Sequence, residues 1–384
     1  MTFYKSFLIS LIVLLILGLT FMAGYILHDQ LSSAKNFPVL NESYQILTTH
    51  GLNEIPTPPA LEYGMIRGML QSYDDPFTVF VEPAQQELQT DSLQGSFGGI
   101  GVRIEKDDRG KWRIYPFPDG PAAQAGIQQA AYLLAIDQLQ LNSDTNLDKI
   151  QAALRGPVGS KVSISISEVS SLVPAIFTLR RAEIQLPSVT WRSPPDNRRI
   201  GILEVNLIAS NTAKELERGF LELQNSGAKE FILDLRNNPG GLLESAIEIS
   251  RLFLKDGVIM QQQYRGKEIE TFRVDHPGKL SDIPLIVLIN QNSASAAEII
   301  AGALQAHHRA KLVGTPSFGK NTIQLVFDLP GGAALHVTSA KWWIPGNDLP
   351  QNGQGLQPDV LINKESDNGS DPVLKSAVQM FANK

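Results

Sequence analysis

Two stretches in which an apolar run leads directly into a helix constrain this chain most. Phe231–Leu235 and Ile283–Asn290 have the length of buried strands, and each is followed by a turn and then by apolar residues at helical spacing. Strands that alternate with helices predict a parallel α/β sheet. Ligands bind such sheets at the C-terminal ends of the strands, where both turns would lie. We therefore expect an α/β (α+β mixed) fold with its functional site at these two turns.

The second turn places a serine at the start of a helix. Ser295 comes directly before Ala296–Leu304, where apolar residues recur at helical spacing. Backbone N–H groups at a helix N-terminus lack intrahelical partners and favour a developing negative charge. Lys320 follows a glycine in a later turn. The two side chains suggest a serine nucleophile with a lysine base.

The composition excludes several classes of function. A length of 384 residues indicates two or three domains. The net charge of −6, with 19% charged residues and no long basic run, argues against nucleic acid as a partner. The absence of cysteine excludes disulfides, thiolate zinc sites and a cysteine nucleophile. The six histidines show no metal-ligand spacing, so no metal site is predicted.

The N-terminal residues 1–28 are predicted to form a transmembrane signal anchor. Phe7–Leu27 contains no charged residue and is long enough to cross a hydrocarbon core of ~30 Å. Lys5 precedes this run, so the positive-inside rule places everything after it outside the cytoplasm. We expect a single-pass protein of the cell membrane with an extracytoplasmic catalytic part. The alternative is a cleaved signal peptide, with Ser32–Ala34 as its small-residue cleavage site.

Residues 29–90 are predicted to form a helical N-terminal region. Glu42–Thr49 and Pro59–Gln71 both show helical spacing, and the proline suits a helix start. Asp74–Phe77 then breaks the pattern, and its paired aspartates indicate a turn rather than an acid–base pair.

Residues 91–183 combine short strands with two short helices. Gly95–Ile104 is a glycine loop that enters a strand and lacks the spacing of a dinucleotide site. This order, together with the sequence Gly-Pro-Ala-Ala-Gln-Ala-Gly-Ile at Gly120–Ile127, resembles a PDZ domain of the bacterial protease type. In such domains a peptide C-terminus adds as a strand beside the one at Ile100–Ile104, and the helix at Leu147–Leu154 forms the other wall of the groove. The resemblance implies four peptide-binding residues: Gly99, Ile100, Gly101 and Val102.

This segment departs from the PDZ pattern at two turns. Gln129–Ala131 stands where these domains usually carry Pro-Gly-Asp, and Gln138 replaces a usual glycine. Both positions lie away from the expected groove. The alternative is that the segment is only a spacer.

Several ordered motifs in the second half resemble one protease family. The blocks Asp234–Gly241, Asn292–Glu298, Gly302–Gln305 and Ser317–Lys320 resemble those of the carboxyl-terminal processing peptidases, or tail-specific proteases. Matching blocks continue to Val360, and with the PDZ segment and the helical region the likeness covers nearly all of the chain from Leu61 to Val360. It implies a crotonase-like parallel-sheet serine peptidase domain over residues 184–363 with an inserted PDZ domain. A polar linker and a short C-terminal helix are expected in residues 364–384.

The resemblance also implies the roles of individual residues. Ser295 would be the nucleophile, Lys320 the general base and Gln324 the residue that orients the lysine. The backbone N–H groups of Gly241 and Ala296 would form the oxyanion hole. This chemistry requires no metal and no cofactor.

A lysine base has to lose its proton near neutral pH. The pKa of Lys320 would have to fall from ~10.4 to about 7–8. We expect burial beside Phe318 and Ile323 to supply that shift, because burial disfavours the ammonium form. Asn321 departs from the family, which commonly has glycine there, so a slightly altered turn is expected.

Three other patterns compete with this interpretation. Gly314–Asn321 approaches a Walker A loop, but residue 321 is not Ser or Thr and a strand-like segment follows. His307 and His308 could suggest a catalytic triad, but no G-x-S-x-G elbow is present, and they suit the end of the helix that begins after Ser295. Ser293 is a rival nucleophile two residues earlier in the turn.

The function predicted from the sequence is that of a membrane-anchored serine endopeptidase. It would recognise exposed C-terminal tails of protein substrates through the PDZ domain and cleave them through an acyl-enzyme. The rival class is a PDZ peptide-binding scaffold whose catalytic site has lapsed. An acyl-CoA enzyme of crotonase-like fold is a third class, which would use neither the PDZ domain nor the anchor. The oligomeric state is left open.

Overall fold

The computed structural model describes residues 17–18, 20–22, 37–168, 173–345, 354–363 and 371–382. The predicted anchor at Phe7–Leu27 lies mostly outside these ranges, and the predicted linker at Lys364–Ser370 lies wholly outside them. No helix within the described ranges has both the length and the apolar character needed to cross a membrane. The chain divides into two compact units, residues 1–74 and 75–384.

Within residues 37–74 of the first unit, helices form where the sequence predicts helical spacing. Helix α2 spans Pro38–His50 and helix α3 spans Ala60–Tyr73, and neither contains a buried residue. Helix α3 ends at Asp74, whose φ of 56° lies in the left-handed region. The predicted end of the helical pattern at Asp74–Phe77 is therefore confirmed.

A small β domain occupies the segment that resembles a PDZ domain. Its antiparallel sheet has the strand order β3-β4-β5-β7-β8, with β6 paired to β5. The elements are β3 (Val102–Lys106), β4 (Trp112–Pro116), α5 (Pro121–Gln124), β5 (Ala131–Ile136), β6 (Leu139–Gln140), α6 (Leu147–Leu154), β7 (Lys161–Ser167) and β8 (Ala175–Arg180). Helix α6 contributes Ile150 to a core that it shares with Ile114 and Ile164 of the sheet.

The glycine-rich start of this domain differs from the prediction. Strand β3 begins at Val102, two residues later than expected, because Gly101 has a φ of 69° and interrupts the strand. The preceding glycine stretch is itself a strand, β2 (Ser96–Gly99), and pairs with β9 (Ala182–Gln185). A Cβ at Gly98 would lie 2.0 Å from the carbonyl oxygen of Gly156, so glycine is required by the close approach of two backbones.

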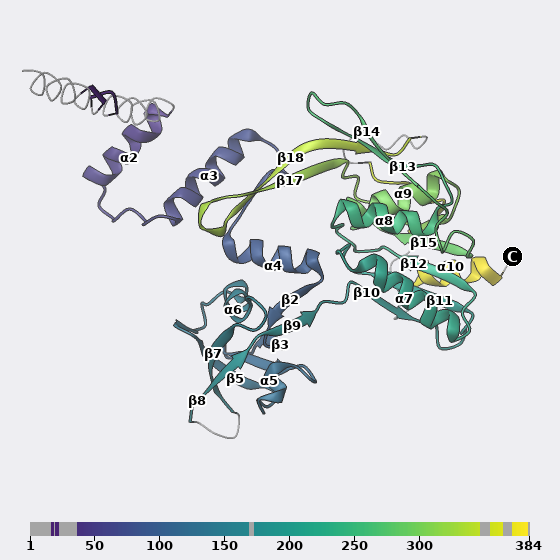
Figure 1. The fold of residues 1–384 in the computed structure, drawn as a ribbon, viewed down its shortest axis with the longest axis horizontal. Helices are drawn as coiled ribbons and strands as arrows, with labels where there is room; N and C mark the ends of the chain where they lie inside the picture. The colour runs from purple at the N-terminus through teal and green to yellow at the C-terminus, as the bar shows by residue number, and fades with distance from the viewer. Residues whose placement is uncertain are drawn as a thin grey trace, which may run out of the picture. The chain divides into compact units, whose positions relative to one another are not determined.

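The central sheet has the predicted parallel α/β architecture (Figure 1). Its order is β10-β11-β12-β15-β16-β19, with all neighbouring pairs parallel except the edge pair β10–β11. The strands are β10 (Val189–Arg192), β11 (Ile200–Val205), β12 (Glu230–Asp234), β15 (Leu285–Ile289), β16 (Lys311–Gly314) and β19 (Val360–Leu361). The helices are α7 (Thr212–Asn225), α8 (Leu243–Phe253), α9 (Ala296–Ala306) and α10 (Pro372–Ala382).

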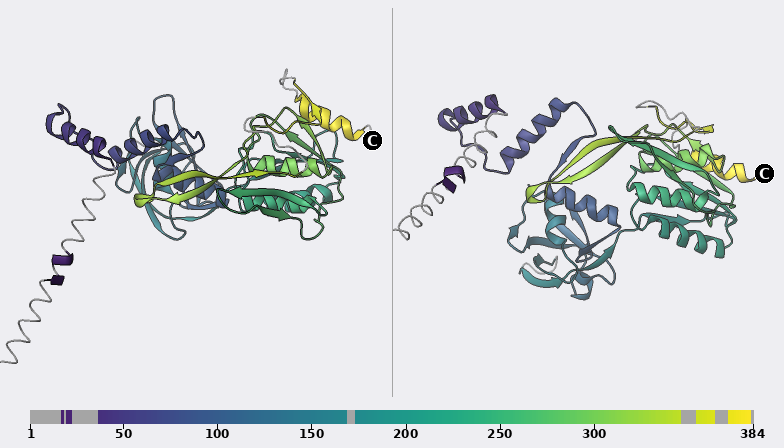
Figure 2. Two further views of the ribbon diagram at one scale, coloured as in Figure 1. Left: turned by 90° about the horizontal axis from the view of Figure 1, so that it is seen from above. Right: turned by 45° about the horizontal axis from the view of Figure 1, so that its top comes forward.

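Apolar side chains bury both faces of the central sheet. Leu233 and Val287 belong to the core on the face covered by α7, α8 and α9. Ile232 and Ile286 belong to a second cluster, which includes residues of α10 (Figure 2). This explains why β12 and β15 are apolar at nearly every position.

A second, antiparallel sheet carries the segment after Ser317. Its order is β1-β18-β13-β14, and β17 pairs with the other edge of β18. The elements are β1 (Val79–Val81), β13 (Val258–Tyr264), β14 (Glu270–Arg273), β17 (Thr322–Asp328), η1 (Pro330–Gly332) and β18 (Ala334–Trp343). Helix α4 (Pro83–Gln94) follows β1 and leads to the small β domain. Strand β1 therefore brings the start of the second unit to the edge of the sheet that contains Gln324.

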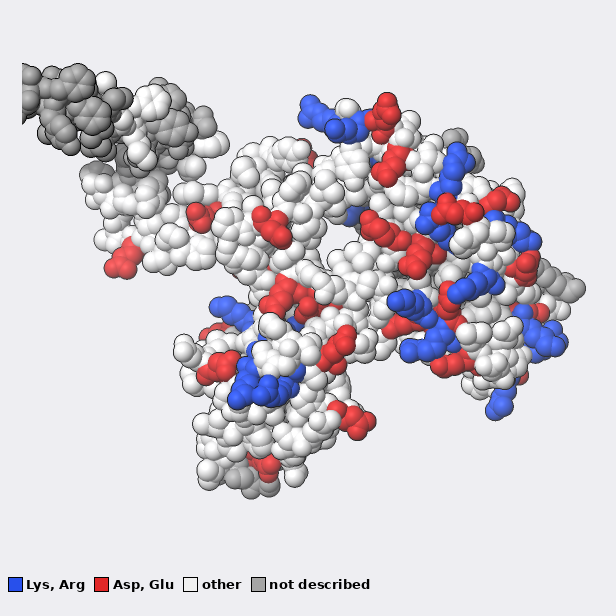
Figure 3. Space-filling model, viewed as in Figure 1, with Lys and Arg blue, Asp and Glu red and all other residues white. Residues whose placement is uncertain are grey.

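The surface of the central domain carries mixed charge. On the face drawn in Figure 3, acidic and basic side chains are interspersed over the elements of the central sheet.

Candidate active site

Ser295 is the N-cap residue of helix α9, as the sequence predicts. Its φ of 54° and ψ of −117° are unusual for a residue other than glycine and make the turn from β15 into the helix sharp. The Glu298 carboxylate accepts a hydrogen bond from the Ser295 backbone N–H at 2.9 Å and stabilises the turn.

The glycine turn after β12 packs against this serine. A Cβ at Gly240 would lie 2.9 Å from the Ser295 Cβ and 3.1 Å from the Ala296 nitrogen, and a Cβ at Gly241 would lie 2.0 Å from the Ile208 oxygen. Both glycines have a positive φ, so only glycine fits these positions without strain. No residue in the described part of the chain accepts a hydrogen bond from the N–H of Gly241 or Ala296. The two turns thus contribute free N–H groups near Ser295.

Ser293, the rival nucleophile, is used inside the turn. Its side chain is 1% exposed, and its hydroxyl donates to the Leu235 carbonyl oxygen at 2.8 Å. The Ser293 hydroxyl oxygen also accepts a hydrogen bond from the Asn290 backbone N–H at 2.9 Å. The Ser293 hydroxyl therefore joins the ends of β12 and β15.

Lys320 lies in a half-buried site formed by residues distant in sequence. Its Nζ donates to Gln324 Oε1 at 2.7 Å and lies 5.0 Å from the centroid of the Phe77 ring. Gln324 Nε2 donates in turn to the Phe77 carbonyl oxygen. Burial lowers the pKa of Lys320, while the negative charges of Asp75 and Glu298 act in the opposite direction. The structure thus brings Lys320 and Gln324 into direct contact, as the resemblance implies.

The prediction that Phe318 helps to bury Lys320 was wrong. Phe318 is 49% exposed, and the aromatic ring near Nζ belongs to Phe77. Asp75 was interpreted only as a turn residue, and it does accept hydrogen bonds from Phe77 N and Thr78 Oγ1. Burial would raise the pKa of Asp75, but the hydrogen bonds from Thr78 and its neighbours, with the charge of Lys320, keep it below its usual range. No local pattern indicated that this turn would reach the lysine.

Glu298 connects the serine turn to the lysine turn. Its Oε2 accepts from the backbone N–H groups of Ser295 and Lys320, each at 2.9 Å. Its Oε1 accepts from Ser317 Oγ at 2.6 Å and from Gly319 N at 2.7 Å. The side chain is 1% exposed, and burial raises the pKa of this carboxyl although the hydrogen bonds oppose the shift. Sequence reasoning missed this residue, although the spacing Ser-x-x-Glu could have indicated it.

The lysine turn requires no left-handed backbone at Asn321. The positive φ in this turn, 88°, belongs to Gly319, and Asn321 does not share it. The Asn321 carbonyl oxygen accepts from Trp342 N at 3.0 Å, which ties the start of β17 to β18. Within the described residues no hydrogen bond joins Ser295 directly to Lys320. Their backbones are instead connected through Glu298.

The four predicted peptide-binding residues lie together on a second site. Gly99, Ile100, Gly101 and Val102 line a narrow cavity of about 50 Å³ with Gln151 and Leu154 of α6. The Ile100 carbonyl oxygen accepts from Ala122 N, and no described residue accepts from the N–H of Ile100 or Gly101. The cavity therefore combines apolar walls with free backbone donors.

Comparison with known proteins agrees with the motifs. The model of peptidase family S41 matches residues 199–362. A carboxyl-terminal-processing protease of Synechocystis is 36% identical over 307 residues, which are 79% of this chain and 71% of that protein. The carboxy-terminal processing protease CtpA of Bacillus subtilis is 31% identical, covering 84% and 68%. A solved photosystem II D1 C-terminal processing protease aligns with a TM-score of 0.47 at 28% identity, covering 83% of this chain and 86% of that one.

The fold and the relatives define a serine-type peptidase with a mixed α/β core. The chain belongs to peptidase family S41, among the carboxyl-terminal processing proteases. The family and the class of enzyme predicted from the motifs are thereby confirmed.

Proposed function

We propose that this peptidase is a membrane-anchored endopeptidase that cleaves protein substrates with a Ser295/Lys320 dyad after binding their C-terminal tails. The observation that carries the dyad is the environment of Lys320. Its amine is half-buried and donates to the uncharged Gln324 Oε1 rather than to a carboxylate. A neutral acceptor orients the amine without holding its proton, which is what a general base requires.

The proposed reaction gives each of these residues a role. The neutral Lys320 amine takes the Ser295 hydroxyl proton as the serine oxygen attacks the substrate carbonyl carbon. The tetrahedral oxyanion is stabilised by the N–H groups of Gly241 and Ala296. The Lys320 ammonium then donates its proton to the leaving amine, and an acyl-enzyme remains on Ser295. Lys320 then takes a proton from water as the water oxygen attacks the ester carbon, and it returns that proton to the Ser295 oxygen as the ester bond breaks, which releases the acid product and restores the free enzyme.

Recognition of the tail is assigned to the small β domain. A C-terminal strand would add beside β3, and its carboxylate would accept from the free N–H groups of Ile100 and Gly101. Helix α6 supplies the facing wall, and Leu154 offers an apolar surface to the last side chain. The arrangement of a PDZ domain is supported by this groove and by the domain's antiparallel sheet.

The membrane part of the proposal rests on the sequence alone. The uncharged run Phe7–Leu27 would anchor the protein and place the peptidase outside the cytoplasm. Membrane fractionation of the full chain and of a variant lacking residues 1–28 tests this part. Recovery of both proteins in the soluble fraction would reject the anchor.

The experiment for the dyad uses a protein substrate with an apolar C-terminal tail and a fluorophosphonate probe that labels activated serines. Wild-type protein should cleave the substrate and take up the label, whereas Ser295→Ala and Lys320→Ala should do neither while they remain folded by circular dichroism. Ser293→Ala serves as the matched control: it should lower the melting temperature but keep the label.

The rival function, a lapsed peptide-binding scaffold, gives a different result in the same experiment. The wild-type protein would then bind the tail but show neither Ser295-dependent labelling nor cleavage. Full activity of Ser295→Ala would contradict the dyad itself.

A further inference from the structure

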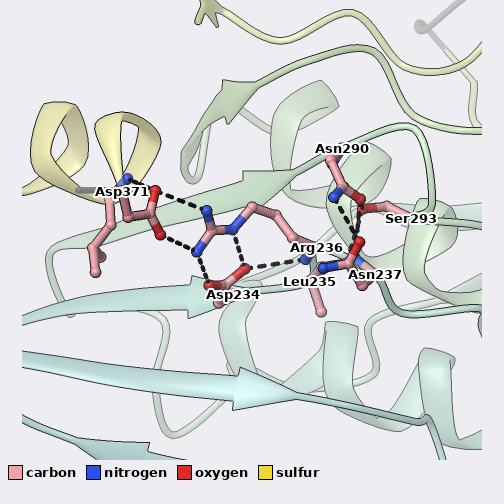
Figure 4. A network of polar contacts seen from close by, with 8 residues as sticks. Asp234, Leu235, Arg236, Asn237, Asn290, Ser293 and Asp371 are labelled. Atoms are coloured by element: carbon pink, nitrogen blue, oxygen red, sulfur yellow. Dashed lines mark hydrogen bonds and ion pairs between the residues drawn. The ribbon is translucent and has the colours of Figure 1, made fainter. Parts of the chain in front are cut away.

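The loop that carries the glycine turn begins with an arginine held by two carboxylates. Arg236 is the second residue after β12, and its Nε and Nη2 donate to the two oxygens of Asp234 at 2.8 and 2.6 Å. On its other side, Nη1 donates to Asp371 Oδ1 at 3.0 Å, and Nη2 lies 2.9 Å from Asp371 Oδ2. Figure 4 shows the guanidinium lying between the two carboxylates. Both contacts use two nitrogens, which fixes the plane of the guanidinium as well as its position.

Asp371 belongs to the start of the C-terminal helix, 135 residues further along the chain. Its Oδ1 also accepts from the Leu374 backbone N–H at 3.0 Å, so the same carboxylate caps α10. Helix α10 buries Ala377 and Phe381 in the cluster on one face of the central sheet. The position of Asp371 is therefore fixed by packing that does not involve Arg236.

The residue after Arg236 is tied to the serine turn. Asn237 has a φ of 58°, and its backbone N–H donates to Asn290 Oδ1 at 2.9 Å. Its side-chain oxygen accepts from Asn290 Nδ2 at 2.9 Å (Figure 4) and from Asn292 Nδ2 at 3.0 Å. The dipeptide Arg236–Asn237 thus connects α10 on one side with the turn before Ser295 on the other.

The connection continues to the glycine turn. Asn238 Oδ1 accepts from Gly240 N at 2.8 Å, and the Asn238 carbonyl oxygen accepts from Ala294 N at 2.9 Å. A loop with two consecutive glycines has high conformational freedom unless it is fixed at its ends. Arg236 fixes the end that leaves β12.

We propose that Asp371 and Arg236 are positioning residues, through which the C-terminal helix holds the Gly241 N–H in place for the oxyanion. This inference rests on the proposed function, because it gives the loop at residues 237–241 a role in the reaction. An oxyanion donor acts mainly in the transition state, so its displacement lowers kcat more than it changes KM. Displacements of the order of 1 Å can cost about 100-fold in rate.

The test uses Asp371→Asn in the full-length protein. Asparagine can still cap α10 through its side-chain oxygen but carries no charge for Arg236. We expect kcat to fall by about 10- to 100-fold, with KM changed by less than about threefold. The pH midpoint of kcat should stay at its wild-type value, since the groups around Lys320 are unchanged. Arg236→Lys should show the same pattern, because lysine keeps the charge but cannot donate to each carboxylate through two nitrogens of one planar group.

The controls separate positioning from helix docking. Gln379→Ala, on the exposed side of α10, should keep the wild-type kcat and KM, and Asp371→Glu should recover part of the lost kcat. A folded Asp371→Asn protein with wild-type kcat and only a lower melting temperature would overturn the inference. If wild-type protein showed no Ser295-dependent cleavage, the proposed function would fall and this inference with it. Ser295-dependent cleavage that Asp371→Asn leaves unchanged would reject the inference alone.

Discussion

Two opposing effects act on the pKa of Lys320. Burial under Phe77 favours the neutral amine, whereas Asp75 and Glu298 favour the ammonium. Burial is the larger effect and lowers the pKa of Lys320. Neither carboxylate forms an ion pair with Nζ in the described part of the chain, and the nearest polar partner is the amide of Gln324. In this site the Lys320 amine therefore binds its proton less tightly than a lysine in water does.

The first prediction concerns the protonation of this lysine. Activity should rise with pH as Lys320 loses its proton, with a midpoint below the ~10.4 of a free lysine. Lys320→Arg should be inactive across the range, because arginine stays protonated. The measurement is kcat/KM against pH with Lys311→Met as an exposed-lysine control, and a profile that does not change between about pH 5 and 10 would contradict a lysine base.

The same shift has a consequence for stability. Since the folded protein holds the Lys320 proton less tightly than the unfolded chain, the free energy of unfolding should rise as pH increases from the folded pKa toward ~10.4. Lys320→Met removes the charge, so its melting temperature at pH 7 should not be lower than that of the wild type. The difference between the two proteins should shrink as the pH approaches 10. Calorimetry at several pH values measures both trends.

At the scale of elements, one carboxylate joins two segments that have to act together. The start of helix α9 carries Ser295, and the turn before β17 carries Lys320. Glu298 accepts hydrogen bonds from both backbones and from Ser317, and all four donors lie within 3 Å of its oxygens. The carboxylate therefore sets the spacing between the backbones of the proposed nucleophile, Ser295, and the proposed base, Lys320.

Replacing this carboxylate by an amide should separate the two segments. In Glu298→Gln, one carboxylate oxygen is replaced by an NH₂ group. This group is a donor and would face N–H donors that now bind the carboxylate oxygen. Loss of two charge-assisted hydrogen bonds should reduce the free energy of unfolding by roughly 2–4 kcal/mol. We expect kcat to fall by about 100-fold. Glu248→Gln, an exposed position on α8, is the matched control, and wild-type kcat in Glu298→Gln would show that the spacing is set elsewhere.

At the scale of the whole molecule, the cavity lined by Gly99–Val102 and α6, which is the proposed peptide groove, belongs to the same compact unit as the candidate active site. Asp91 of α4 forms an ion pair with Arg155 at 2.9 Å, at the end of the helix that forms the groove wall. Helix α4 follows β1, and β1 follows Phe77, whose carbonyl oxygen holds Gln324. Along the chain, the small β domain thus follows, through β1 and α4, the segment whose Phe77 carbonyl oxygen accepts a hydrogen bond from Gln324.

If the groove binds substrate tails, blocking it should affect only substrates that have one. Gln151→Trp would fill the groove from α6 without altering the domain core, whereas Lys149→Trp places the same ring on the exposed side of the helix. Cleavage of a tail-bearing protein should become about tenfold less efficient through KM in Gln151→Trp alone, which corresponds to a loss of about 1.4 kcal/mol in binding. A short peptide whose C-terminus is amidated, and which therefore offers no C-terminal carboxylate to the groove, should be cleaved equally by all three proteins. Equal cleavage of the tail-bearing protein would remove the groove from the function.

Local features of the site were predictable because backbone geometry follows from short sequence patterns. The helix after Ser295 and the glycine turn after β12 each lie within a few residues of a recognisable signal, whereas the contact of Lys320 with Gln324 was expected only from the resemblance to the family. The prediction for Phe318 was wrong because alternation along a segment does not tell which neighbour will cover a side chain. The glycine stretch before Gly99 was mistaken for a loop because its partner strand, β9, lies more than 80 residues away in sequence.

The sequence by itself determined the type of chain: a parallel α/β core with a serine at a helix start and glycines opposite it. These features depend on steric limits and hydrophobic spacing, which act over a few residues. Only the tertiary structure decided what surrounds them. Phe77 reaches Gln324 across 247 residues, and Asp371 reaches Arg236 across 135. Such contacts depend on how complete elements pack, so no local pattern in the chain encodes them.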